Sequence, residues 1–210
     1  MPAIRAVAIV GAGLVGSGWA IVFARGGLAV KVYDAEPSIL ASVLERIEAS
    51  LRDMKAVGLV DDVEGVLGRI SVASSLADAV GDADYVQESV FERTDVKTAI
   101  SLEIDAAMRP DAVVGSSSSG IPASAFTEGC RNRSRFLIAH PVNPPHLVPL
   151  VELVPAPWTD PAIVPELRTA MEAVGQKPIV VNREIEGFIL NRLQGALLNE
   201  AWALFEEGYA

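Results

Sequence analysis

The sequence contains only two histidines, His140 and His146. Histidine is the side chain that most readily takes up and releases a proton near neutral pH, so the search for a general base starts at these positions. His140 closes an apolar run at residues 135–140, whereas Glu152 interrupts a second apolar run at 150–154. On neighbouring strands, the imidazole could act as a general base and the carboxylate could orient it.

The geometry of this pair depends on how the two apolar runs are paired. If they form antiparallel strands about the proline-rich segment between them, with His140 opposite Leu150, then Ile138 lies opposite Glu152. His140 and Glu152 are then diagonal neighbours on one face of the sheet. A carboxylate beside an imidazole fixes its tautomer, orients the ring and stabilises its protonated form. The pattern leaves an equal alternative, in which a partly buried Glu152 binds a backbone group or an arginine.

A glycine-rich turn near the start of the chain has the order of a dinucleotide-binding motif. A β-branched apolar run at residues 4–10 predicts a buried strand, and residues 14–25 have apolar side chains at helical spacing. A second apolar run at 28–33 ends in Asp34. The turn between the first strand and the helix consists of Gly11, Ala12, Gly13, Leu14, Val15 and Gly16.

Each part of this motif has a physical reason to bind an adenine dinucleotide. Gly11 allows a tight turn out of the strand, Gly13 lets a diphosphate approach the backbone, and Gly16 lets the helix pack closely on the sheet. The helix N-terminus offers free N–H groups to the phosphates. Asp34 can accept hydrogen bonds from a ribose and repels a 2′-phosphate. The sequence therefore predicts NAD, rather than NADP, as the cofactor.

Length, charge and cysteine content limit the class of protein. A chain of 210 residues, half of them hydrophobic, is long enough for one domain with a sizeable core and the start of a second. The net charge of −10 argues against a nucleic-acid partner or an anionic membrane surface. The single cysteine, Cys130, cannot form an internal disulfide, so we expect a cytoplasmic location and an inert thiol. Residues 6–24 are uncharged, as in a signal peptide or a membrane span, but their glycines stand where a nucleotide-binding turn needs them.

Strands and helices alternate through most of the chain, which predicts an α/β fold with a Rossmann-like, doubly wound, mostly parallel sheet. The expected strands lie at residues 4–10, 28–33, 70–73, 84–90, 112–115, 135–140, 150–154 and 178–181. The expected helices lie at residues 14–25, 38–57, 75–80, 94–108, 161–174 and 187–208. We expect Thr94 or Asp95 to cap the helix that starts there, a loop or short turn at 61–69, and a polar serine turn at 116–120.

The last helix has apolar residues over more than the single stripe that a surface helix needs. They are Phe188, Ile189, Leu190, Leu193, Leu197, Leu198, Trp202, Leu204 and Phe205. We therefore expect this helix to be covered by another subunit or by a further helical domain, and we favour the second because only Tyr209 and Ala210 follow it.

Several motifs, in order along nearly the whole chain, resemble the L-3-hydroxyacyl-CoA dehydrogenases. They are the glycine motif at 7–16, Gln87-Glu88-Ser89-Val90 with Glu92 and Lys97, the serine turn, His140-Pro141-Val142-Asn143-Pro144, Leu150-Val151-Glu152 and Gly187-Phe188-Ile189-Leu190-Asn191-Arg192. Residues 140–145, 148–155 and 187–207 are most similar to the lambda-crystallin and L-gulonate 3-dehydrogenase branch. The resemblance implies an NAD-binding domain at 1–184. At 185–210 it implies the start of an all-α C-terminal domain, otherwise absent here, that closes the substrate site and forms a homodimer.

The resemblance also implies roles for individual residues. His140 would be the general base that removes the proton of the substrate hydroxyl, and Glu152 its orienting carboxylate. Ser119, whose spacing to His140 matches the family, would bind substrate and cofactor, with Ser118 as the alternative. Asn191 would polarise the oxygen that becomes a carbonyl. The residues implied to contact the cofactor are Glu92, Lys97 and Asn143.

The substrate class depends on the end of the long second helix, where the acyl-CoA enzymes have a lysine that meets the CoA phosphates. This sequence has Val57 there and Lys55 two residues earlier, whereas Ser50 matches a serine on the CoA side and Lys97 a residue close to the substrate. The implied reaction is hydride transfer from the secondary alcohol of an L-3-hydroxy acid similar to L-gulonate to NAD⁺. A 3-hydroxyacyl-CoA such as 3-hydroxybutyryl-CoA, or L-carnitine, is the alternative substrate. A non-catalytic, crystallin-like NAD-binding protein is the alternative class.

Overall fold

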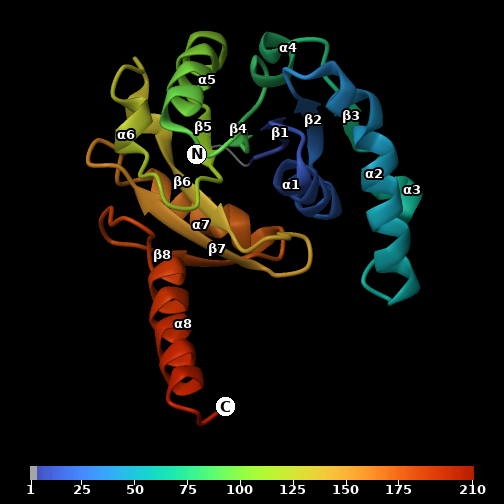
Figure 1. Ribbon diagram of the computed structural model, residues 1–210. Coiled ribbons are helices and arrows are strands. Elements are labelled where there is room, and N and C mark those ends of the chain that lie inside the picture. The colour runs from blue at the N-terminus through green and yellow to red at the C-terminus, as the bar shows by residue number, and fades with distance from the viewer. Residues whose placement is uncertain (1–3) are drawn as a thin grey trace.

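The computed structural model describes residues 4–210, which form an eight-stranded sheet with helices on both faces (Figure 1). The strands are β1 (Ala6–Val10), β2 (Ala29–Tyr33), β3 (Ile70–Val72), β4 (Tyr85–Glu88), β5 (Val113–Ser116), β6 (Phe136–Pro141), β7 (Leu150–Pro155) and β8 (Lys177–Val180). The longer helices are α1 (Leu14–Arg25), α2 (Pro37–Ala56), α5 (Thr94–Ala107), α7 (Ile163–Ala173) and α8 (Leu190–Glu206). The shorter ones are α3 (Val63–Leu67), α4 (Leu76–Val80), α6 (Ser124–Thr127) and the 3-10 turn η1 (Arg133–Arg135).

The strands follow the order β3-β2-β1-β4-β5-β6-β7-β8 across the sheet. Strands β1 to β6 are mutually parallel, β7 is antiparallel to β6, and β8 runs parallel to β7. This arrangement confirms the predicted doubly wound, mostly parallel sheet. The chain moves outward from β1 in one direction through β2 and β3, and in the other direction from β4 onward. Open α/β sheets bind ligands at such a reversal of strand order, beside the carboxyl ends of the strands.

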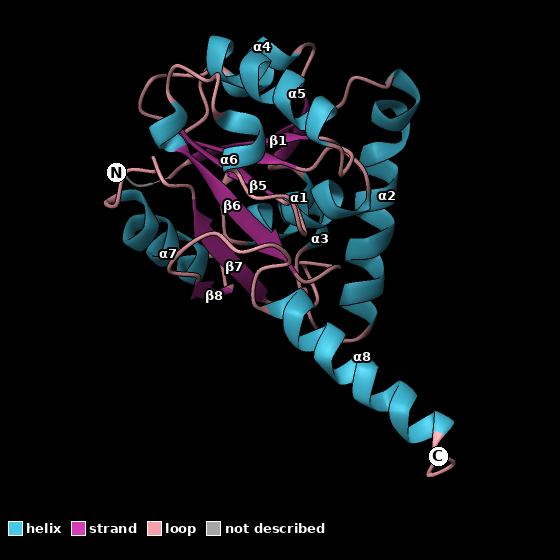
Figure 2. Cartoon of the chain, turned by 60° about the vertical axis from the view of Figure 1, so that its left-hand side comes forward, coloured by secondary structure: helices cyan, strands magenta, loops and turns pink. Residues whose placement is uncertain are grey.

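Alternate side chains of the strands pack against helices on opposite faces of the sheet. Val7 and Ile9 of β1 belong to a buried cluster with side chains of α1, α2, α3 and α7. Ala8 and Val10 of the same strand belong to a second cluster with side chains of α4 and α5. A strand buried on both faces is expected to be continuously apolar, as β1 is. Figure 2 shows the sheet between these helices.

Local predictions differ from the structure at α3, at the start of α5 and at α6. The segment 61–69, expected as a loop or short turn, contains helix α3, because the Asp62 carboxylate accepts a backbone N–H inside the helix at 2.8 Å and caps it. The expected cap of α5 at Thr94 or Asp95 is wrong, since the capping position is Arg93, whose side chain makes no capping hydrogen bond. Helix α6 was not predicted, because four residues are too few for an apolar periodicity.

Helix α8 projects from the body of the molecule (Figures 1 and 2). It begins at Leu190, later than predicted, because two residues with positive φ at 187–188 turn the chain first. None of its residues is buried, and Leu193, Trp202 and Phe205 are each more than 60% exposed. Within the described residues, therefore, nothing covers the apolar surface for which the sequence predicts a cover.

Candidate active site

The glycine turn between β1 and α1 is shaped for a ligand to approach its backbone. Gly11 has a φ of +97°, and a Cβ there would lie 2.6 Å from the backbone of Ser89, just after β4. A Cβ on Gly16 would lie 1.8 Å from the carbonyl oxygen of Gly11, so the close approach of α1 requires glycine. A Cβ on Gly13 would meet no atom within 4 Å, so the space beside that residue is open. No side chain caps α1, which leaves its first N–H groups for a diphosphate.

Asp34 connects the end of β2 to the glycine turn. Its Oδ2 accepts the N–H of Ala12 at 2.7 Å, and its Oδ1 accepts the N–H of Glu36 at 2.9 Å. Asp34 and Gly13 line a cavity of about 680 Å³ together with residues that follow β4, among them Val90. The cavity lies where the strand order reverses, and it is lined by backbone, by apolar side chains and by the acidic residues Asp34, Glu36 and Glu103. Apolar walls suit an adenine ring, and carboxylates can accept hydrogen bonds from the hydroxyls of a ribose. The residues present thus fit a dinucleotide. We call Asp34 and the turn 11–16 the cofactor edge.

Arg46 of α2 is a neighbour of the cofactor edge that sequence reasoning missed. Its Nη2 donates to the carbonyl oxygen of Ala12 at 2.7 Å, and its Nη1 donates to Ser42 Oγ at 2.8 Å. Ser50 lies one helical turn further along, where its Oγ donates to the Arg46 carbonyl oxygen at 3.1 Å. No local sequence pattern identifies Arg46, because its contact with the turn depends on how α2 packs beside α1. Val57, just beyond α2, is 71% exposed.

His140 and Glu152 form a cross-strand pair, but in a different register from the predicted one. They lie directly opposite each other, so the prediction of diagonal neighbours with Ile138 opposite Glu152 is wrong. The reason is that the ladder continues through Pro141, paired with Val151, and the connecting loop begins later than assumed. Direct pairing places His140 Nδ1 2.8 Å from Glu152 Oε2, with His140 only 7% exposed. The two strands thus bring together the imidazole and the carboxylate that the sequence predicts to be a general base and its orienting group.

Glu152 uses its two oxygens for two sets of partners. Oε2 faces His140, whereas Oε1 accepts the N–H groups of Ile189 at 2.8 Å and Leu190 at 2.9 Å. Burial raises the pKa of Glu152, but the hydrogen bonds from His140 and from these two amides outweigh burial, and the net pKa lies below its usual range. The ionised carboxylate accepts the Nδ1–H of His140, which leaves the lone pair on Nε2. Glu152 therefore has both a histidine and backbone groups as partners, which the sequence left as alternatives.

The serine turn after β5 is closed around the carboxylate of Glu92. Its Oε1 accepts the N–H groups of Ser119 at 2.9 Å and Gly120 at 3.1 Å, and lies 2.7 Å from Ser118 Oγ. Burial raises the pKa of Glu92, but the Ser118 hydroxyl, the charge of Lys97 and the two amides bring the net pKa below its usual range. Ser118 is fully buried and its hydroxyl bonds within the turn, whereas Ser119 is exposed. The geometry therefore favours Ser119 as the serine that meets a ligand.

Lys97 and Glu88 form a buried ion pair behind the serine turn. Lys97 Nζ lies 3.0 Å from Glu88 Oε1 and 3.7 Å from Glu92 Oε2, and the side chains of Lys97 and Glu88 are each 1% exposed. Lys97, implied by the resemblance as a cofactor and substrate contact, is thus enclosed by protein and reaches the serine turn through Glu92. Glu88 belongs to the motif Gln87-Glu88-Ser89-Val90, which by itself predicts no role for this residue. The signal was its place at the end of a buried strand.

Asn191, in the first turn of α8, connects that helix to the serine turn. Its Nδ2 donates to the carbonyl oxygen of Ser119 at 2.6 Å. The start of α8 therefore joins Ser119 and Asn191 to the His140–Glu152 pair, and we call these four residues the catalytic corner. Asn143 follows His140 by three residues and is exposed on the loop between β6 and β7, where the peptide bond that follows it is cis.

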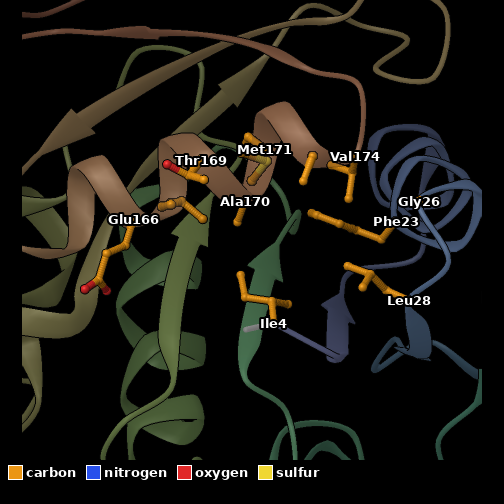
Figure 3. Close-up of a pocket in the computed structure, with 11 residues that line it drawn as sticks. Ile4, Phe23, Gly26, Leu28, Glu166, Thr169, Ala170, Met171 and Val174 are labelled. Atoms are coloured by element: carbon orange, nitrogen blue, oxygen red, sulfur yellow. The ribbon is translucent and has the colours of Figure 1, made fainter. Parts of the chain in front are cut away.

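A further cavity, of about 410 Å³, lies at the opposite ends of the strands (Figure 3). Ile4 and Leu28, which precede β1 and β2, face Met171 of α7 and Val174, which follows that helix. The amino ends of parallel strands lie away from the edge at which such sheets bind ligands. We therefore do not assign the dehydrogenase chemistry considered above to this cavity.

The surroundings of Cys130 and of the second histidine, His146, shift the pKa of each side chain. Burial, with a smaller contribution from Asp105, raises the pKa of the Cys130 thiol to about 11, which agrees with the expected inert thiol. Burial and the charge of Arg25 lower the pKa of His146. Among the residues that the structure describes, no helix has the length and apolarity of a membrane span, and no cluster of side chains could hold a metal ion.

Known proteins resemble this chain over nearly all its length. Residues 6–185 match the family described as "3-hydroxyacyl-CoA dehydrogenase, NAD binding domain". The chain is 43% identical to the lambda-crystallin of Oryctolagus cuniculus, over 99% of this chain and 66% of that protein. It is 37% identical to an L-carnitine dehydrogenase of Streptomyces coelicolor, over 99% of this chain and 64% of that protein. The structure of 3-hydroxybutyryl-CoA dehydrogenase from Escherichia coli matches with a TM-score of 0.92 at 29% identity, over 99% of this chain and 44% of that chain. This chain spans about two thirds of the length of these curated relatives.

Proposed function

The chain belongs to the 3-hydroxyacyl-CoA dehydrogenase family and carries its NAD-binding domain, and on that premise we propose that it is part of an NAD-dependent dehydrogenase of an L-3-hydroxy acid. The main support is the 2.8 Å contact between His140 and Glu152. His140 lies at the carboxyl end of β6, on the edge of the sheet that also carries the glycine turn. Oxidation of a secondary alcohol needs a base with a fixed tautomer beside a dinucleotide.

The residues of the catalytic corner supply orientation and proton transfer. Glu152 accepts the Nδ1–H of His140, so Nε2 presents its lone pair to the substrate hydroxyl and takes its proton. The same carboxylate stabilises the imidazolium that forms. NAD⁺, when bound, supplies the acceptor for the hydride that leaves the alcohol carbon. Ser119 and Asn191 lie together at this corner and donate hydrogen bonds to the substrate oxygen as it becomes a carbonyl.

A small hydroxy acid similar to L-gulonate is the substrate that we favour. Val57 is 71% exposed at the end of α2, where the acyl-CoA enzymes have a lysine for the CoA phosphates. An exposed valine offers no charge to a phosphate, which weakens the case for CoA. The alternatives are 3-hydroxybutyryl-CoA and L-carnitine, and one relative at 37% identity is named as an L-carnitine dehydrogenase.

We also propose that residues 185–210 begin a helical region through which two copies form a homodimer in the cytoplasm. The support is the exposed apolar surface of α8, which includes Leu197 and Trp202 at 70% and 62% exposure. A surface of this kind is stabilised by packing against other apolar side chains.

A comparison of substrates tests the proposal in the full-length protein. NADH formation is measured with L-gulonate, L-carnitine and 3-hydroxybutyryl-CoA, and we expect kcat/KM to be at least about tenfold higher for L-gulonate. The variant Val57→Lys is the matched control, because it should raise kcat/KM for the acyl-CoA and leave the two free acids unchanged. A higher value for L-carnitine or the acyl-CoA in the wild type would reassign the substrate. NAD binding without turnover of any of them would favour the non-catalytic alternative.

A further inference from the structure

Phe188 stands between β8 and α8 and combines two features that rarely occur together. Its φ is +48°, and among the described residues it is the one non-glycine residue with a positive φ. Its side chain is fully buried, and the centroid of its ring lies 5.6 Å from that of the His140 imidazole, with an interplanar angle of 56°. A bulky residue persists in this backbone region only when the surrounding structure requires it.

The ring of Phe188 is fixed by the apolar core beneath the catalytic corner. It belongs to a buried cluster with Phe126 of α6, Ile138 of β6 and Val154 of β7. Ile138 and Val154 pair with each other and are two residues away from the catalytic pair along their strands, so they lie on the same face of the sheet. Phe188 therefore packs on the same surface from which the imidazole and the carboxylate project.

The backbone of Phe188 directs the start of α8 at the catalytic pair. Gly187 also has a positive φ, of +74°, so two consecutive left-handed residues turn the chain before the helix. The next two N–H groups, those of Ile189 and Leu190, then donate to Glu152 Oε1. The residue after them, Asn191, donates to the serine turn. Figures 1 and 2 show that α8 leaves the body of the molecule from this junction.

We propose that Phe188 is a positioning residue of the reaction, whose ring and left-handed backbone hold the amides of Ile189 and Leu190 on Glu152 and thereby set how that carboxylate holds His140. This inference rests on the proposed function. Two donors on Oε1 draw negative charge away from Oε2, so the protonated imidazole is stabilised less than by a carboxylate that lacks them. Loss of these donors makes the imidazole a stronger base with a less defined orientation. The placement of α8 is thereby coupled to the proton-accepting group.

The first test needs no substitution. In the intact, ¹⁵N-labelled protein, the N–H chemical shifts of Ile189 and Leu190 are followed by NMR while the imidazole of His140 titrates. Because one carboxylate joins the three groups, we expect both amide signals to move with the same midpoint as the His140 ring. The ring of His146 gives an independent midpoint for comparison. Amide signals that stay constant through the His140 titration overturn the proposal.

The second test removes the ring of Phe188. Phe188→Leu is expected to move the midpoint of the His140 ring signal to higher pH, and to lower kcat about tenfold while KM for NAD is unchanged. Val181→Ala is the matched control, because Val181 belongs to the same buried cluster but directly follows β8 and is not part of the catalytic pair. Neither value should move in the control.

The second test requires a folded variant of Phe188. If Phe188→Leu does not fold, Phe188→Met is used, because its unbranched, flexible side chain adapts to the space that the ring leaves. A folded Phe188 variant with the wild-type midpoint and kcat overturns the proposal. The midpoints are measured without substrate, so a protein that oxidises none of the hydroxy acids overturns the proposed function alone and leaves the coupling to be decided by NMR.

Discussion

The cofactor edge and the catalytic corner lie at the carboxyl ends of strands in the same sheet, but they are built from different parts of the chain. The cofactor edge is mainly backbone, with open space beside Gly13 and a helix start that no side chain caps. In the catalytic corner the groups are already bonded to partners, as Glu152 is to His140 and Asn191 is to the carbonyl oxygen of Ser119. The first region is arranged to receive a ligand, whereas the second holds reactive groups in place.

This difference predicts that the two regions can be damaged separately. A substitution at the cofactor edge changes the space or the N–H groups available to the diphosphate and should therefore change affinity for NAD. A substitution in the catalytic corner removes a proton acceptor or a donor to the substrate and should change turnover. We expect the largest effect from a substitution in the catalytic corner and the smallest from one in the serine turn.

His140→Ala is expected to have the largest effect. Loss of a positioned general base should lower kcat by about a hundredfold or more, because such groups contribute factors of roughly 10² to 10⁴. The dissociation constant for NAD should stay close to the wild-type value, since the glycine turn is unchanged. His146→Gln is the control for loss of a histidine outside the corner. Unchanged turnover in His140→Ala would remove His140 from the chemistry, and a large loss of NAD affinity would contradict the separation of the two regions.

Two substitutions, Gly16→Ala and Gly13→Ala, test the cofactor edge. In Gly16→Ala the new Cβ meets the Gly11 carbonyl oxygen at 1.8 Å, so we expect a loss of about 2 kcal/mol or more in the free energy of unfolding. In Gly13→Ala the new Cβ meets no protein atom within 4 Å, so stability should be retained. The methyl group there occupies the space that the diphosphate needs, and affinity for NAD should fall at least about tenfold.

Urea unfolding and NAD titration of both variants check this pair. Gly195→Ala, at a position on α8 where an added Cβ also meets no atom within 4 Å, is the control for the substitution itself. If Gly13→Ala binds NAD as tightly as the wild type, the diphosphate does not lie over this residue.

The cofactor edge was predictable because its signals are local in the sequence. Gly11, Gly13 and Gly16 lie within one turn, and the strand before them and the helix after them have clear apolar patterns. The position of Asp34 at the end of the strand beside this turn follows from the strand order. The contact of Arg46 with this turn was not predicted, since it depends on how α2 packs beside α1, which no local pattern specifies.

The catalytic corner was predictable only in part, because its contacts join segments far apart in the sequence. The pattern identified His140 and Glu152 as residues on paired strands, but the register was wrong because the end of a strand at Pro141 cannot be read from apolar character. The second role of Glu152, as acceptor for the start of α8, required the left-handed backbone at Phe188. That conformation has no sequence signal in an aromatic residue.

The smallest expected effect concerns the serine turn. There the carboxylate of Glu92 holds the shape of the turn, whereas at the cofactor edge the backbone itself does so. The pKa of Glu92 in the folded protein lies below its usual value, because the Ser118 hydroxyl, Lys97 and two amides together outweigh burial. Its ionised form therefore stabilises the folded state above about pH 4.3, and this contribution is lost as the pH falls through the lowered pKa. Glu92→Gln should thus unfold at lower urea than the wild type at about pH 7, with a smaller difference at about pH 3.

Urea midpoints at the two pH values check this prediction, with Glu45→Gln on an exposed position of α2 as the control. Gly13→Ala is a second reference, since it changes no titrating group and its small difference from the wild type should be the same at both pH values. If the difference for Glu92→Gln is also the same at both, the amides of Ser119 and Gly120 are held by the shape of the turn and the charge of Glu92 adds nothing. The serine turn would then resemble the glycine turn in its physical basis, and the contrast between the two regions would be confined to His140, Glu152 and Asn191.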